Sequence, residues 1–437
     1  AIYHPGKTYG SRRIDLCYKC QKNIFQKKFF HKMDTTSQFN KSLQRIQFVF
    51  TLSGLTFQSK KLSKKEILKT RSMYLIDFLF LNSGLLGAVY WFVDGIRTGK
   101  KFEELTFVAP CITFSLLCDL KPAYLIHYED LACNLVEHLR KLENKSTKWT
   151  KEKAEMRKRE ANFLHRILKS SNVVNTMLLL TFSVSPFISM TISYIQTKEV
   201  ELILPLLIKY PFDSFDIKFW PLAYVHQFWA VVVVIIHIIG PDYLLYVCCT
   251  YLCIQFRLLQ YEIKDVIVSN KILTESEEAL FEEKILELIK WHQELIELAD
   301  LLELIYTKST LFNFVSSSLL ICLTGFNVIA VKNLAFAVSF FVFLATNLLQ
   351  IYLLCYFGDL VMKSSMEIGD AVYDSKWYYI NAKAGKNLQI VQARAHKPCK
   401  LTALGFSDVN LRAFMSILSS AWSYFALLKT LYTPTNN

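Results

Sequence analysis

The sequence predicts an all-α membrane protein with seven transmembrane helices, and three observations lead to this fold class. Hydrophobic residues make up 52% of the 437 residues and charged residues only 20%, whereas soluble domains carry roughly 25% charge. The apolar residues gather in seven runs of about 20 residues, the length that crosses a bilayer as a helix. Basic residues lie between these runs and contribute to a net charge of +13. This segregation argues against a soluble enzyme.

The seven expected spans are filled with Leu, Phe, Ile and Val and lack the alternation of a strand. They cover residues 73–96, 105–126, 172–195, 222–253, 310–331, 335–362 and 410–432. A weaker apolar run at 46–58 is too short to cross a bilayer. We expect it to form either a re-entrant or interfacial helix, or an amphipathic helix in the cytoplasm.

The distribution of Lys and Arg predicts the orientation of the chain. These residues are about five times more frequent before the first span and in the 2–3, 4–5 and 6–7 connections than on the other side. The positive-inside rule therefore predicts a cytoplasmic N-terminus and an extracellular C-terminus. This topology is the reverse of a G-protein-coupled receptor. The chain also lacks a DRY-type triplet after span three and an N-P-x-x-Y motif in span seven.

The segments between the spans predict a cytoplasmic helical anchor. Acidic and basic residues alternate at helical spacing over 127–170, which is typical of an exposed helix. A heptad seam follows in 274–306, and it needs a partner from the same chain or from a second subunit. The seam consists of Phe281, Ile285, Leu288, His292, Leu295, Ala299, Leu302 and Tyr306. We interpret His292 as a packed polar residue and not as a ligand.

The sequence carries no catalytic or cofactor signature. It has no G-x-x-x-x-G-K, G-x-S-x-G or H-E-x-x-H motif, so we expect neither an enzyme nor a cofactor. Cys17 and Cys20 have the spacing of half a zinc site without a second half, so we expect no metal. The basic cytoplasmic segments suit the anionic headgroups of membrane lipids. Nucleic acid is not needed to explain them.

The seventh span carries a polar stripe. Ser416, Ser420, Ser423, Leu427 and Thr430 follow one another at steps of 4, 3, 4 and 3, so they share one helix face. Several copies around a symmetry axis would form a wet pore with an apolar constriction, which gates by dewetting. The alternative is that these serines only allow helices to pack closely.

The last third of the chain carries a set of motifs that resembles the insect odorant receptor family. The motifs are Ala371-Val-Tyr373 with Ser375 and Trp377, Arg394 with Lys397-Pro398, Leu401-Thr-Ala403 with Phe406, then Phe414, Ile417, Leu418 and residues 423–429. The span count, the inverted topology and the chain length also fit. The resemblance covers nearly the whole chain, and its C-terminal motifs are the specific part.

The resemblance implies an odour-gated, nonselective cation channel in the plasma membrane of olfactory sensory neurons. An odour-specific subunit assembles there with a co-receptor into a heterotetramer, and span seven lines a central pore. The apolar gate falls on Leu427 and Leu431, next to Thr430, where the co-receptor has Gln. The 4–5 connection lacks the long insertion of the co-receptor, which favours an odour-tuning subunit. A gustatory-type chemoreceptor and a metabotropic receptor remain as alternatives.

The resemblance also implies a ligand pocket for a volatile, mostly apolar molecule among the outer halves of spans two, three, four and six. The matching side chains are mostly aromatic, and Thr113, Tyr194 and His226 are the polar ones. The expected lining is Phe107, Thr113, Phe114, Phe187, Met190, Tyr194, His226, Phe228, Trp229, Phe336, Phe340 and Phe343. Aromatic residues at 210–213 and 219–221 suggest an ordered interfacial loop over this site.

Together these features divide the chain into three regions. Residues 1–72 form a cytoplasmic N-terminal segment with the candidate re-entrant helix. Residues 73–362 hold spans one to six, their cytoplasmic extensions and the ligand pocket. Residues 363–437 complete the anchor and hold the pore-lining seventh span.

Overall fold

Seven long helices dominate the computed structural model, which describes residues 38–56, 64–145, 150–267 and 275–432. All seven are long and apolar enough to cross a membrane. They are α3 (Lys64–Arg97), α4 (Phe102–His127), α6 (Lys151–Thr197), α7 (Trp220–Asp265), α8 (Glu275–Ala330), α9 (Leu334–Asp374) and α11 (Leu411–Tyr432). Each predicted span lies inside one of these helices or extends at most one residue beyond its end, although several of the helices are much longer than the span. The predicted fold class is therefore confirmed.

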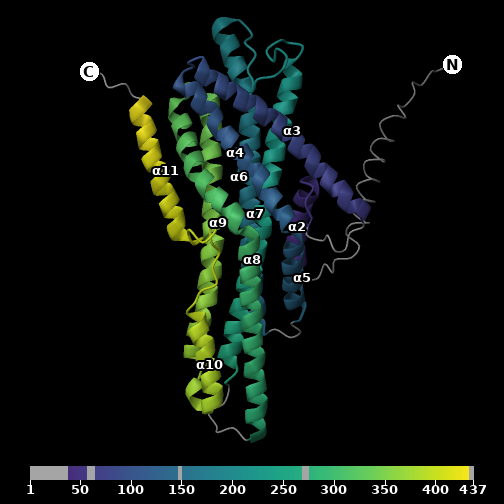
Figure 1. Cartoon of the computed structure of the whole chain (residues 1–437), viewed down its shortest axis with the longest axis vertical. Coiled ribbons are helices and arrows are strands. Elements are labelled where there is room, and N and C mark those ends of the chain that lie inside the picture. Colours follow the sequence, from purple (N-terminus) through teal and green to yellow (C-terminus); the bar gives the residue numbers. More distant parts are fainter. Residues whose placement is uncertain (1–37, 57–63, 146–149, 268–274, 433–437) are drawn as a thin grey trace, which may run out of the picture.

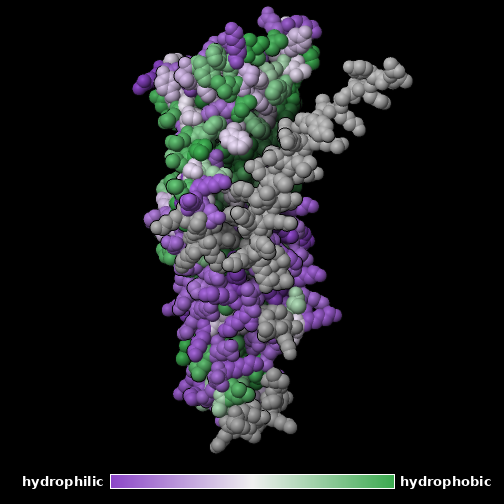
Figure 2. Space-filling model, turned by 90° about the vertical axis from the view of Figure 1, so that its right-hand side faces the viewer, coloured by the Kyte–Doolittle hydropathy of each residue, from purple (hydrophilic) through white to green (hydrophobic). Residues whose placement is uncertain are grey.

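The helices divide the molecule into two parts along its long axis. Helices α7, α8 and α9 continue beyond their apolar segments, and α10 (Ala382–Ala395) packs on α9 and α8 to complete a narrow bundle, which we call the anchor (Figure 1). We call the opposite end of the molecule the distal end. Hydrophobic side chains gather on the distal half, and hydrophilic ones cover most of the anchor half (Figure 2).

The predicted heptad seam forms the core of the anchor. Its residues from Ile285 to Tyr306 are buried, and Phe281 packs against the same core. Helix α8 contacts α7, α9 and α10 of its own chain, so the seam finds its partners within one subunit. His292 is 4% exposed and lies in this packed seam, as the sequence indicates.

Three shorter helical pieces complete the described fold. Helix α5 (Glu129–Lys145) lies beside α8 and α7, and a 3-10 turn spans Trp377–Tyr379. Helix α2 (Gln38–Leu52) buries Phe39, Leu43, Ile46 and Phe50 at steps of 4, 3 and 4 and packs mainly on α7. The weak apolar run at 46–58 thus begins inside α2, and its last two residues lie outside the described part.

Candidate functional site

A cavity of about 80 Å³ lies in the distal half, enclosed by α3, α4, α6, α7 and α9. We call it the ligand cavity, after the ligand pocket that the sequence predicts in this region. Since about 15 Å³ on this measure suffices for one water, it has room for a small organic molecule. Its lining is almost entirely apolar, with Ser115 and Cys111 as the polar members. The other lining residues include Leu81, Leu85, Phe107, Val108, Ile112, Phe114, Leu178, Phe182, Ala230, Val234 and Phe343.

Edge-to-face aromatic pairs build one side of this cavity. The ring centroids of Phe107 and Phe340 are 4.9 Å apart, and those of Phe114 and Phe343 are also 4.9 Å apart. Phe182 of α6 contacts both Phe340 and Phe343, at 6.0 and 5.9 Å. Such pairs are favourable beyond the area that they bury. Five predicted residues meet here, since Phe336 also packs against Phe107, at 5.6 Å.

His226 of α7 lies beside the cavity in a hydrogen-bonded group. The Ser83 hydroxyl donates to the Phe80 carbonyl at 2.6 Å, so its oxygen accepts from His226 Nε2 at 3.0 Å. His226 Nδ1 then accepts from the Tyr210 hydroxyl at 2.9 Å. Burial raises the pKa of Tyr210, which keeps this donor protonated. The group fastens the 198–219 connection to α7 and α3.

The remaining predicted ligand residues lie away from the cavity. Phe187, Tyr194, Phe228 and Trp229 are exposed on the surface of the chain, and Met190 is half-buried. The Thr113 hydroxyl donates a hydrogen bond to the Ala109 carbonyl of its own helix, at 2.9 Å. Whether these positions contact a ligand stays untested. The cavity is lined by other residues of the same helices, such as Phe182 and Ala230, which lie on a different helix face.

Three apolar residues of the 198–219 connection close the cavity on one side. They are Leu206, Leu207 and Ile208. The sequence indicated that this connection covers the site, through the aromatic residues at 210–213 and 219–221. The residues that line the cavity are instead aliphatic. The apolar run at 202–208, too short to cross a bilayer, is a signal that could have identified them.

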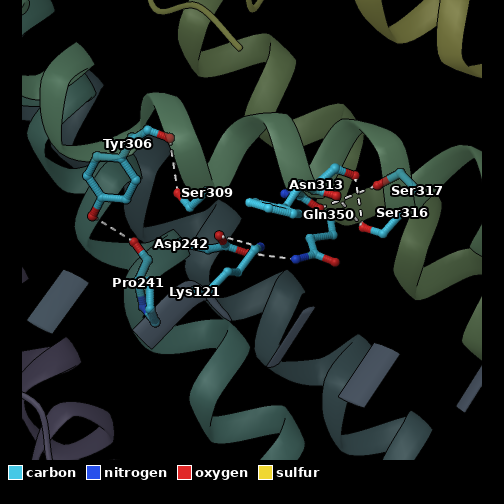
Figure 3. Close-up of polar contacts among 10 residues, drawn as sticks. Lys121, Pro241, Asp242, Tyr306, Ser309, Asn313, Ser316, Ser317 and Gln350 are labelled. Atoms are coloured by element: carbon cyan, nitrogen blue, oxygen red, sulfur yellow. Dashed lines mark hydrogen bonds and ion pairs between the residues drawn. The ribbon is translucent and has the colours of Figure 1, made fainter. Parts of the chain in front are cut away.

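A buried ion pair lies at the anchor side of the cavity. Lys121 Nζ of α4 donates to both carboxylate oxygens of Asp242, at 2.8 and 2.9 Å. Gln350 of α9 donates to the same carboxylate at 2.8 Å, so three helices meet at Asp242 (Figure 3). The carbonyl of Pro241, the residue before Asp242, accepts a hydrogen bond from the Tyr306 hydroxyl of α8 at 3.0 Å. Phe114 separates this polar junction from the ligand cavity, since it lines both.

The polar stripe of α11 faces away from the rest of the chain. Ala413, Ile417 and Ala421 are buried, in a helix that packs on α8 and α9 at one side of the bundle (Figure 1). The stripe residues are exposed, except for half-buried Ser420: they are Ser416, Ser420, Ser423, Leu427 and Thr430. The side chain of Leu431 lies outside the described part. The described residues of one subunit thus leave most of the stripe open for other contacts.

The hydroxyls of the stripe are partly satisfied within the helix. Ser420, Ser423 and Thr430 donate to the carbonyl four residues earlier, at 3.0, 3.0 and 2.9 Å. Their oxygens still have acceptor capacity. Such a face tolerates water without leaving buried donors unpaired.

The described residues contain no group of three His, Cys, Asp or Glu side chains placed to hold a metal. Cys17 and Cys20 lie outside the described part. The nine described cysteines are free thiols, and eight of them are buried.

Comparisons with known proteins agree with this architecture. A family model described as 7tm Odorant receptor matches residues 101–422. Odorant receptor 67c of Drosophila melanogaster is 25% identical over 413 residues, which cover 92% of this chain and 98% of that receptor. Putative odorant receptor 92a of the same species is 27% identical over 374 residues, covering 83% and 88%.

A solved structure shares the fold. The olfactory receptor OR5 from Machilis hrabei, in complex with eugenol, superimposes with a TM-score of 0.76 at 15% identity. The superposition covers 90% of this chain and 98% of that one. The two chains therefore share one fold over most of their length.

Proposed function

Because the chain belongs to the insect odorant receptor family, we propose that it is the odour-binding subunit of a ligand-gated, nonselective cation channel. Family membership makes it a multi-pass membrane receptor and not an enzyme. The single observation that carries the proposal is the pairing of an apolar cavity in the helix bundle with a polar helix face that the described residues of its own subunit leave mostly exposed.

The ligand class follows from the cavity. Its lining offers aromatic rings and aliphatic groups with few polar atoms, which suits a volatile, mostly apolar molecule held by shape and dispersion. The related OR5 binds eugenol, a small aromatic molecule. We propose ligands of this chemical class for the present chain, with Phe107, Phe114 and Phe343 in contact with them.

The pore and the assembly follow from α11. We propose that α11 lines a central pore, with Leu427 and Leu431 at the gate and Thr430 beside them. The partner in the heterotetramer is a co-receptor, and this chain is the odour-tuning member. The assembly lies in the plasma membrane of olfactory sensory neurons, with the N-terminus and the anchor in the cytoplasm, against membrane lipids.

Recording current from cells tests this function. Cells make this chain with the co-receptor, this chain alone, or the co-receptor alone, and are exposed to a panel of volatiles that includes eugenol. We expect a cation current evoked by a subset of volatiles only when this chain and the co-receptor are present together. Absence of any evoked current, despite surface expression of both chains, contradicts the channel.

The same recordings distinguish a channel from a metabotropic receptor. Inhibitors of G-protein signalling leave a ligand-gated current intact, because its pore belongs to the receptor itself. A metabotropic receptor loses its response under these inhibitors. We expect the evoked current to persist.

A further inference from the structure

Two cavities lie back to back at the distal end, separated by a short stretch of the 198–219 connection. Leu206, Leu207 and Ile208 bound the ligand cavity on one side. The same three residues bound a second cavity of about 470 Å³, which we call the outer basin. The outer basin reaches the surface, because its lining residues Tyr90 and Phe215 are 60% and 54% exposed. We call residues 206–208 the wall.

One side chain of α7 fixes the start of the wall. Gln227 is fully buried, and its Oε1 accepts from the backbone N–H of Leu206 at 2.8 Å. Its Nε2 donates to the Leu206 carbonyl at 3.1 Å. A single amide thus pairs both backbone polar groups of Leu206, as a neighbouring strand would.

A glycine of α3 fixes the end of the wall. The backbone N–H of Lys209 donates to the Gly87 carbonyl at 3.2 Å. A Cβ at position 87 would lie 2.6 Å from Ile208 Cγ2 and 2.6 Å from the Lys209 carbonyl oxygen. Such distances are shorter than van der Waals contact, so the wall can rest against α3 only because residue 87 has no side chain.

The wall is the weakest boundary of the ligand cavity. Its backbone runs outside any helix, and the three hydrogen bonds above, together with the Tyr210–His226 hydrogen bond two residues further on, hold it to α7 and α3. The other boundaries are helices, whose separation would expose packed apolar side chains such as Phe114 and Phe343. Segments with few buried contacts open at the lowest free energy.

We propose that the outer basin is the entrance for apolar ligands, and that the wall moves aside to admit them to the ligand cavity. Gln227 and Gly87 are positioning residues that set how often the wall opens. The proposal rests on the proposed function, since it takes the ligand cavity as the binding site. Neither residue needs to alter affinity, because the wall returns to the same closed position around a bound ligand.

Stopped-flow fluorescence tests the entrance with the full chain in lipid nanodiscs and with N-phenyl-1-naphthylamine, a neutral aromatic probe that brightens in apolar surroundings. Gln227→Met keeps the length of the side chain and removes both hydrogen bonds. We expect its association and dissociation rates both to rise about tenfold, because two hydrogen bonds of ordinary net strength are lost. The dissociation constant should change little. Gly87→Ala, which pushes the wall from α3, should act in the same direction.

Gly385→Ala is the matched control, because a Cβ there meets no atom within 4 Å; it should bind at wild-type rates. If Gly87→Ala does not fold, Gln227→Met carries the test. Wild-type rates in both wall variants, or a change confined to dissociation, overturn the entrance and indicate a route from the lipid. A wild-type chain that binds no probe contradicts the ligand cavity itself, and with it the proposed function.

Discussion

The buried ion pair between Lys121 and Asp242 is the residue-scale feature with the largest predicted effect on stability. The two side chains are 4% and 9% exposed. Removing one partner leaves the other charge buried and unpaired, at a cost of about 3–5 kcal/mol. We therefore expect Lys121→Met to lower the unfolding temperature in detergent strongly. A thiol-reactive fluorophore can follow unfolding, because buried cysteines such as Cys248 and Cys249 become accessible.

The double variant separates charge burial from loss of packing. Asp242→Asn combined with Lys121→Met removes both charges and keeps an acceptor for Gln350, so it should recover most of the lost stability. Lys264→Met is the control, since its pair with Asp374 is 46% and 53% exposed and such pairs contribute about 0–1 kcal/mol. A double variant as unstable as Lys121→Met alone would contradict the explanation by an unpaired buried charge.

The sequence could not predict which single side chains line the cavity. The chain has 33 Phe, and their chemistry does not reveal which of them face a cavity. Phe182 lines the cavity and Phe187 lies on the surface of the same helix. The step from one to the other is five residues, so the second side chain is rotated about the helix axis by roughly 500°, or about 140° net, from the first. Helical phase decides the outcome, and packing against distant helices sets that phase.

At the scale of the element, α11 carries the clearest functional prediction. Leu427 is 59% exposed on the face that we assign to the pore. Leu427→Ala and Leu431→Ala remove apolar side-chain atoms and widen the constriction, so water enters more easily and the basal current rises. We expect either change to alter basal current or ion permeability in the recordings described above. Together they test whether the stripe is a pore wall.

Leu79→Ala on α3 provides the matched control for this helix. Leu79 is 60% exposed on a helix that we expect to face lipid, and the substitution removes the same atoms. It should leave the current unchanged. If neither α11 variant changes the current while both reach the surface, the stripe serves helix packing only.

Elements were predicted more fully than single residues because long apolar runs and heptads are repeated signals. All seven spans and the seam from Phe281 to Tyr306 could be read from spacing alone. The sequence did not show whether the seam pairs within a subunit or between subunits. That choice depends on where α9 and α10 return along α8, which no local pattern in α8 encodes.

At the scale of the whole molecule, the net charge of +13 and the long apolar helices are two aspects of one arrangement. The anchor half is covered by hydrophilic side chains, and the distal half carries the exposed apolar surface (Figure 2). A bilayer therefore fits around the distal half. The excess of Lys and Arg in the connections on the anchor side predicts that the anchor half lies in the cytoplasm, because positive charge is retained there.

This arrangement predicts which termini are accessible on an intact cell. A C-terminal epitope tag should bind antibody on unpermeabilised cells, whereas an N-terminal tag should bind only after permeabilisation. The physical reason is that reversing the bundle would carry the basic connections and the anchor across the membrane, against the potential. Each tagged chain must first give the same evoked current as the untagged one, so that labelling reports on working receptors. Labelling of the N-terminal tag on intact cells would contradict this orientation. The ligand cavity would then lie toward the cytoplasmic side of the bilayer, which a ligand arriving from outside the cell does not reach first.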